Sequence, residues 1–245
     1  MPVKYIVISL VAVVLSFIGG FLIANAFNRA EIESMRREND GYKNAANVAA
    51  NQSENAALSA EAIKEKVDEA DSNPDNTDFQ RNLGLALYRY ASAQQDLALL
   101  EDSIRLLERA RNAKADDQDV LIALGNANFD IAYFGKANER YVVARRLYDE
   151  GVSLSPENPD LLTDRGLTYF LSEPADYSAA EREFAAALAI APNNERTLQL
   201  AIEANWQLGQ MQRATELLER LKETNPQNPA IPDLSTRLLR PPPTP

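Results

Sequence analysis

The side chains that most often perform catalysis or bind transition metals are missing from this sequence. Its 245 residues include no cysteine and no histidine. Without cysteine there is no disulfide, thiol nucleophile, thiolate zinc site or iron–sulfur site, and without histidine the commonest general base is lost. A hydrolase built on paired carboxylates is the remaining enzymatic alternative. We expect no catalytic residue, cofactor or metal ion, and therefore a protein that is not an enzyme.

One acidic run contains the residue types of a cation site. Asp116, Asp117 and Asp119 lie within four positions of one another. A calcium site needs more oxygen ligands and a defined loop, whereas acidic residues before an apolar periodic segment are typical of a helix start. We therefore interpret the run as capping or solvation of the helix that follows it.

Aromatic residues recur at a fixed place in a repeated unit. The units begin at Thr77, Gln118, Pro159 and Glu195, with starts 41, 41 and 36 residues apart. The twelfth place is aromatic in every unit, and is occupied by Tyr88, Phe129, Phe170 and Trp206. Internal repetition of this length indicates a stacked array, in which each repeat contacts its neighbours.

Small and large residues also recur inside the units. The small residues are Gly84, Gly125 and Gly166, and then Ser103, Ala144, Ala180 and Ala214; four places after the latter are Leu107, Tyr148, Phe184 and Leu218. Pro156, Pro192 and Pro226 end units. This pattern resembles the tetratricopeptide repeat family, whose unit has about 34 residues. The resemblance implies an all-α protein, a right-handed superhelix of stacked helix-turn-helix repeats in which small residues let paired helices approach closely.

The resemblance also implies where partners bind. In this family the twelfth place lies on the inner helices, so the four aromatic residues are candidates for a partner-binding concave groove; packing between adjacent helices is the alternative. Some relatives bind a C-terminal carboxylate through a lysine and an asparagine four residues later. The matching positions hold Arg81 with Leu85 and Ile122 with Asn126. That clamp is absent, and Arg81 and Asn126 remain candidate groove residues only.

Several positions depart from the family pattern. Ile202 replaces the glycine of the fourth unit, Ala115 replaces the proline of the first, and Gln80 stands where a bulky residue is usual. The first two units are longer than the family's by about two helical turns, so we expect both of their helices to be one turn longer. The two extra residues of the third unit, near Ser172, predict a longer loop.

The N-terminal segment predicts a transmembrane anchor. Residues 5–27 carry no charge and lie between Lys4 and Arg29. As a helix they would span about 34 Å, enough for a bilayer core of about 30 Å and longer than the apolar part of a cleaved signal peptide, which is the alternative. Small residues at four-residue steps favour a homodimer seam on this helix. They are Ala12, Ser16, Gly20 and Ala24.

Two observations on membrane orientation oppose each other. Arg29, Arg36 and Arg37 outnumber the cations before the anchor, which by the positive-inside rule places the repeats in the cytoplasm. A short N-terminus, one apolar run and a large soluble domain form the layout of exported, signal-anchored bacterial proteins. We expect a single-pass bacterial inner-membrane protein with periplasmic repeats, and the cytoplasmic alternative stays open.

The domain order follows from these segments. The anchor occupies residues 1–28, a polar stalk 29–57 and a lead-in helix 58–76. Four repeats occupy 77–117, 118–158, 159–194 and 195–228, followed by a capping segment over 229–240 and a proline-rich mobile tail over 241–245. The stalk is rich in asparagine, alanine and charge and has no apolar stripe, which is typical of a solvated segment.

Charge and layout together predict an interaction protein. The formal net charge of −11 argues against nucleic acid and favours basic protein or peptide partners. The layout resembles the anchored repeat proteins of bacterial cytochrome c biogenesis and envelope assembly. We expect a membrane-anchored scaffold for protein or peptide binding, in the assembly of an envelope or respiratory complex. The alternative is a structural module that only oligomerises the chain.

Overall fold

The computed structural model describes residues 59–240 of the chain. The predicted anchor with its small-residue seam, the stalk and the proline-rich tail lie outside these residues. The described part consists of α-helices and contains no strand. Within it, no helix is both long enough and apolar enough to cross a bilayer.

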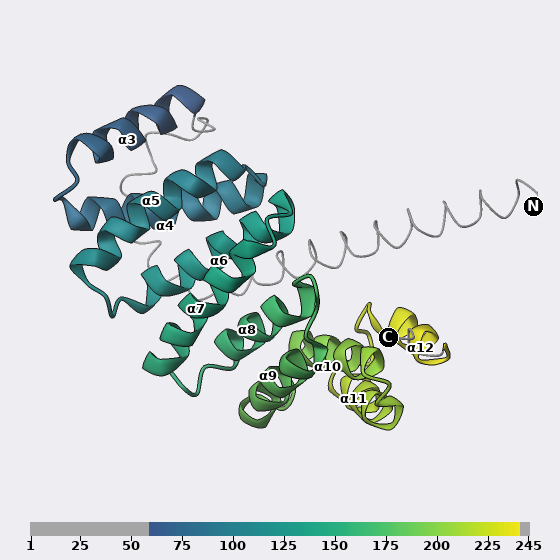
Figure 1. The fold of residues 1–245 in the computed structure, drawn as a ribbon. Helices are drawn as coiled ribbons and strands as arrows, with labels where there is room; N and C mark the ends of the chain where they lie inside the picture. Colours follow the sequence, from purple (N-terminus) through teal and green to yellow (C-terminus); the bar gives the residue numbers. More distant parts are fainter. Residues whose placement is uncertain (1–58, 241–245) are drawn as a thin grey trace, which may run out of the picture. The chain divides into compact units, whose positions relative to one another are not determined.

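Four pairs of consecutive helices stack one after another (Figure 1). The pairs are α4 (Thr77–Gln94) with α5 (Leu97–Ala113), α6 (Gln118–Gly135) with α7 (Glu139–Leu154), α8 (Pro159–Leu171) with α9 (Tyr177–Ile190), and α10 (Glu195–Gln207) with α11 (Met211–Thr224). Each first helix begins where a repeat unit begins in the sequence. Each second helix packs on its own first helix and, up to α9, on the first helix of the next pair. The stack is therefore a solenoid, and its handedness stays a prediction.

Polar side chains start most of these helices. The capping residues accept hydrogen bonds from backbone N–H groups of the first turn, and they are Asn76, Asp96, Asp117, Asn158, Asp176 and Asn194. Asp117 accepts from the N–H of Val120 at 3.3 Å. The capping interpretation of the acidic run is thus confirmed for Asp117. Among residues 59–240, no group of three or more acidic side chains is placed to hold a metal ion.

In three pairs, a glycine of the first helix faces a large side chain of the second. The facing residues are Gly84 and Leu107, Gly125 and Tyr148, and Gly166 and Phe184. A Cβ on these glycines would lie 2.8, 2.5 and 2.6 Å from the nearest atom of that side chain. The predicted register of small and large residues is therefore confirmed. In the fourth pair, Ile202 and Leu218 are buried in the same core cluster instead.

The extra residues of the first two units lengthen the first helices more than the second. The first helices α4 and α6 have 18 residues, whereas α8 and α10 have 13. The second helices α5 and α7 have 17 and 16 residues, against 14 in α9 and α11, so they gain less than the full turn that we expected. Each second helix ends six residues after its large residue, which is Leu107, Tyr148, Phe184 or Leu218. The additional residues of α5 and α7 therefore lie at their N-terminal ends, next to the loop that joins the two helices of the pair.

Two single helices cover the ends of the stack. In α3 (Ala60–Ser72), Ile63 and Val67 are buried in a cluster with Leu87 of the first pair. In α12 (Ile231–Leu238), Leu234 is buried in the core of the last pair, and Leu238 packs against the same core. Apolar faces that would otherwise meet water at the two ends of the stack are covered in this way.

Gln80 explains one departure from the repeat pattern. Its side chain is fully buried, and its amide nitrogen donates to the carbonyl oxygens of Ala70 at 2.6 Å and Asn73 at 3.0 Å. Its amide oxygen accepts from Arg109 at 3.3 Å. An apolar side chain would leave carbonyl groups at the end of α3 without this donor. The glutamine therefore fits a unit whose neighbour is a lone helix.

Candidate functional site

The candidate groove residues all lie on first helices and are all half-buried. Arg81 and Tyr88 belong to α4, Asn126 and Phe129 to α6, Phe170 to α8 and Trp206 to α10. Helices α4, α6, α8 and α10 also contact one another in order along the stack. The structure therefore brings the aromatic residues onto one series of neighbouring helices, each with part of its ring exposed.

Two of the aromatic rings pack inside their own repeat. The Phe129 ring meets the Tyr141 ring of α7 edge-on, with 5.5 Å between centroids, and is parallel to the Tyr133 ring at 6.3 Å. The Phe170 ring meets Tyr177 edge-on at 5.2 Å and Phe184 at 6.5 Å. Both rings thus take part in packing while remaining half-buried, and their role in a partner-binding groove stays a prediction.

Trp206 is engaged by the C-terminal end of the described chain. The guanidinium carbon of Arg237, on α12, lies 5.5 Å from its ring centroid, which is within cation–π range. Its indole N–H donates to the carbonyl oxygen of Arg240 at 3.3 Å. Among the aromatic candidates, this one holds a covering helix in place.

Arg81 and Asn126 each bind a neighbour within the fold. Arg81 donates to Asp117 at 2.8 and 3.2 Å and to Asp119 at 2.6 Å, which joins α4 to the start of the next unit. The Arg81 guanidinium lowers the pKa of Asp117. The amide oxygen of Asn126 accepts a hydrogen bond from the Tyr148 hydroxyl at 2.7 Å. Both residues therefore fix the relative position of helices within the stack.

Ion pairs between neighbouring parts of the stack were not predicted, and two of them involve carboxyl groups whose pKa is raised by burial. Arg196 of α10 donates to Asp164 of α8 at 2.5 Å, and Arg237 of α12 donates to Glu203 of α10 at 3.2 Å. Burial raises the pKa of both carboxyl groups, and the arginine beside each opposes that rise. The signal that could have revealed them was the placement of opposite charges about one unit apart in the sequence.

Sequence reasoning also missed a ring cluster at the end of α6. We call Phe129, Tyr133, Phe134 and Tyr141 the α6 ring cluster. The Tyr133 and Phe134 rings meet edge-on at 5.3 Å, and both lie in the turn that lengthens α6. Tyr133 follows Phe129 by four residues, which is the spacing of neighbours on one helix face. The sequence could therefore have predicted this contact if the additional residues of the second unit had been assigned to its first helix.

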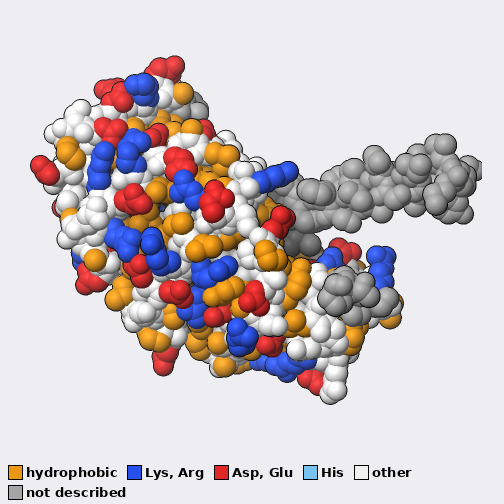
Figure 2. Space-filling model, in the orientation of Figure 1, with side chains coloured by type: hydrophobic (Ala, Val, Ile, Leu, Met, Phe, Trp, Pro, Cys, Tyr) orange, Lys and Arg blue, Asp and Glu red, His pale blue; other side chains and the backbone are white. Residues whose placement is uncertain are grey.

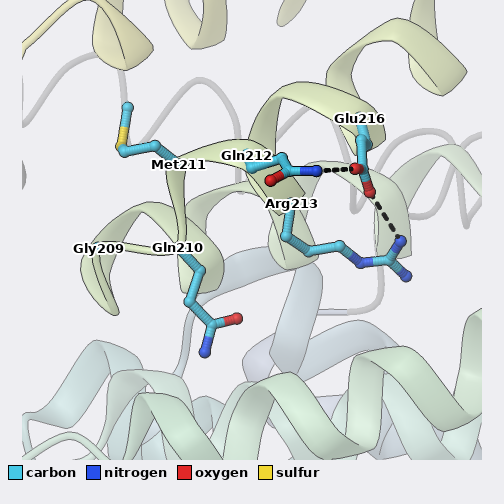
Figure 3. Close-up of a pocket in the computed structure, with 6 residues that line it drawn as sticks. All are labelled: Gly209, Gln210, Met211, Gln212, Arg213 and Glu216. Atoms are coloured by element: carbon cyan, nitrogen blue, oxygen red, sulfur yellow. Dashed lines mark hydrogen bonds and ion pairs between the residues drawn. The ribbon is translucent and has the colours of Figure 1, made fainter.

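A hollow on the described surface lies at the start of α11, away from the first helices, where Figure 3 shows Gln212 and Arg213 turned toward Glu216. Glu216 accepts from them at 3.0 and 3.4 Å, so its charge is already bridged. On the face shown in Figure 2, acidic, basic and apolar side chains are intermingled. The row of first helices stays the predicted interaction site.

Comparisons with known proteins agree with this architecture. Residues 171–238 match a model of the tetratricopeptide repeat. A crystal structure of MamA is 20% identical and superposes with a TM-score of 0.54 over 68% of this chain and 82% of that one. YrrB, described as a TPR protein with an unusual peptide-binding site, is 14% identical, with a TM-score of 0.57 over 72% and 82% of the two chains.

A third solved structure also shares the repeat fold. The thermophilic TPR protein TTC0263 of Thermus thermophilus is 17% identical, with a TM-score of 0.53 over 73% of this chain and 90% of that one. No curated protein matches the sequence. At these identities, the solved structures support the repeat fold of the chain, whose first helices carry the half-buried rings.

Proposed function

Because this chain carries tetratricopeptide repeats, we propose that it is a non-enzymatic scaffold whose inner helices bind a segment of another protein. The observation that carries the proposal is the row of Tyr88, Phe129 and Phe170. These rings occupy the same place on three consecutive first helices, and each is half-exposed. Aromatic side chains are the commonest anchors of protein interfaces, because they bury much apolar surface at little entropic cost.

Ion pairs between units support a fixed binding surface. Arg81 joins the first and second units through Asp119 and through Asp117, which caps α6, and Arg196 joins the third and fourth through Asp164. Side chains that are already held lose less freedom when a partner binds. A fixed spacing between the rings therefore favours an extended or helical segment that places apolar side chains at matching intervals.

Charge supports a basic partner. The net charge of −11 attracts basic segments at long range and repels acidic ones. The peptide-binding site described for YrrB is in keeping with peptide recognition by this chain, although the fold alone does not fix the ligand. Assembly of an envelope or respiratory complex is the process we propose for such a scaffold, on the layout of anchor followed by repeats.

We also propose that the uncharged residues 5–27 anchor the protein in a bacterial inner membrane, uncleaved, with the repeats in the periplasm. The length of this segment supports the anchor, and the large domain after it supports export. Phosphatase and fluorescent-protein fusions at Pro245 report opposite compartments. We expect activity of the phosphatase alone, and fluorescence alone would place the repeats in the cytoplasm.

Peptide selection tests the scaffold proposal. The full-length chain in detergent micelles is panned against a random library of peptides, and selected peptides are titrated by fluorescence anisotropy. Phe129→Ala and Phe170→Ala should each weaken binding, by about 2 kcal/mol where the ring is an anchor. Val142→Ala is the matched control, because Val142 is an apolar residue 62% exposed on a second helix.

Three results would count against the proposal. Failure to select any peptide, with capture only of the chain itself, would indicate the purely structural module. Equal weakening by the Val142 control would show that binding does not use the inner rings. Loss of melting temperature without loss of binding would assign Phe129 and Phe170 to packing alone.

A further inference from the structure

The lengthened end of α6 differs from the corresponding part of the other first helices. Helices α8 and α10 end at Leu171 and Gln207, before this turn would begin. In α4 the turn exists, and its residue at the place of Tyr133 is Ser92, which is buried. Among the four described units, therefore, only the second has another aromatic ring, Tyr133, one turn after the aromatic residue of the twelfth place.

The α6 ring cluster presents aromatic surface to solvent. Phe129, Tyr133 and Phe134 are half-buried, whereas Tyr141 is 4% exposed and forms the base against which Phe129 packs. The Phe129 and Tyr133 rings are parallel within 9°. Aromatic faces carry partial negative charge, so an exposed ring face attracts a cation placed against it.

Two carboxylates lie close to these rings. Asp130 follows Phe129 on α6 and is half-buried, and Glu173 lies in the α8–α9 loop. Asp130 precedes Tyr133 by three residues, the spacing of neighbours on one helix face. Burial raises the pKa of Tyr141, and the charges of Tyr133, Glu173 and Asp130 raise it further. The cluster is thus an aromatic surface in a negative field.

The neighbouring loop and cation are fixed by other contacts. Asn138 donates to the carbonyl oxygen of Glu173 at 2.7 Å and accepts from its N–H at 2.8 Å, which holds the loop beside the start of α7. Arg140, the cation next to Tyr141 in sequence, donates to Asn128 at 3.0 Å and to Glu101. Arg140 is therefore committed to other acceptors.

We propose that the α6 ring cluster, with Asp130 and Glu173, receives a lysine or arginine side chain of the bound protein segment. This inference rests on the proposed scaffold function and adds to it the position and chemistry of one specificity site. The apolar stem of the basic side chain lies along Phe129 and Tyr133, and its charged end lies near the two carboxylates. Long basic side chains suit such a site because their stems are apolar.

The test compares charged and neutral ligands in matched variants. Peptides selected on the full-length chain in detergent micelles are resynthesised with each arginine replaced by citrulline and each lysine by norleucine. For at least one position, we expect the neutral peptide to bind wild type at least about tenfold more weakly. In Tyr133→Leu or Asp130→Asn, the difference between charged and neutral peptides should shrink to about twofold or less. The change in the protein and the change in the peptide then remove the same interaction, so their effects do not add.

A charge-matched variant separates this site from long-range attraction. Asp233→Asn changes an exposed aspartate of α12 and alters the net charge as Asp130→Asn does, so it should keep the tenfold difference. If charged and neutral peptides bind equally, or if the difference is the same in Tyr133→Leu and Asp130→Asn as in wild type, the proposed site is wrong while peptide binding stands. If no peptide is selected, both this inference and the scaffold proposal fail.

Discussion

Gly125 and Tyr148 meet at the closest approach of α6 and α7, where a Cβ on the glycine would lie 2.5 Å from Cε1 of the ring. The ring is 1% exposed, and its hydroxyl donates to Asn126 at 2.7 Å. Moving the ring aside would break that hydrogen bond and disturb a buried cluster with Ala144 and Leu161. Packing of the helix pair therefore requires a residue without a side chain at position 125.

Gly125→Leu should destabilise the described domain, because the added side chain has no space between α6 and the Tyr148 ring. Overpacking of a tight core costs about 1–3 kcal/mol. Thermal unfolding followed by circular dichroism measures the loss. Gly135→Leu is the control, since Gly135 is exposed and the atom nearest to a Cβ there, 3.2 Å away, is the end of the Leu97 side chain, which is 37% exposed and can move. An unchanged melting temperature in Gly125→Leu would contradict the register.

The repeat register could be predicted because its signal is local. Gly125, Ala144 and Tyr148 lie within one unit, and the same small and large types recur in neighbouring units, so the crossing of paired helices follows from sequence spacing alone. The place of the aromatic residues on first helices follows from the same register. Their individual contacts do not, because these depend on side chains of other helices.

Contacts between units could not be predicted from the repeat pattern. Asp164 meets Arg196, while Gln80 meets the end of α3, and equivalent places in other units hold different residue types. Repeats with the same backbone arrangement are therefore joined to their neighbours by different side-chain contacts. The engagement of Trp206 by Arg237 likewise depends on the path of the chain after the last pair, which no repeat specifies.

Gln80→Leu should weaken the docking of α3, although leucine is nearer to the usual residue of the family. The substitution removes the hydrogen bonds from the Gln80 amide to the carbonyl oxygens of Ala70 and Asn73, and the acceptor of Arg109, at a net cost of about 0.5–1.5 kcal/mol per hydrogen bond. Hydrogen exchange of α3 amides should accelerate more than that of α6. Gln94→Leu, on the exposed end of α4, should leave the exchange of α3 unchanged. Equal protection of α3 in both variants would contradict the role of Gln80.

Asp117→Asn should destabilise the junction of the first two units in a pH-dependent way. Hydrogen bonds from Arg81 hold the pKa of Asp117 below its ordinary value of 3.8, despite the opposing effect of burial. The folded pKa is thus lower than the unfolded one, so the contribution is present above pH 3.8 and is lost as the pH falls through the folded pKa.

Urea unfolding of wild type and Asp117→Asn at several pH values tests this dependence. At neutral pH we expect a difference in unfolding free energy of about 1 kcal/mol, since the pair is partly exposed. Asparagine can still cap a helix, so the comparison isolates the charge. Asp119 pairs with the same arginine, and its side chain is 71% exposed, so Asp119→Asn should cost less. A difference that stays constant down to the lowest pH would contradict the assignment.

Leu234→Ala should release α12 from the end of the stack, and Trp206 should report the release. Leu234 is 3% exposed within the core of the last pair, and truncating a buried leucine to alanine costs about 2–5 kcal/mol. Trp206 is the sole tryptophan of the chain, and its ring and N–H contact Arg237 and Arg240 at the end of α12. Its fluorescence emission should therefore shift to longer wavelength at temperatures below the main unfolding transition.

Leu239→Ala is the matched control, because Leu239 is 87% exposed. The Trp206 emission of this variant should equal that of wild type. A red shift in both variants, or in neither, would show that Trp206 does not depend on the docking of α12 through Leu234.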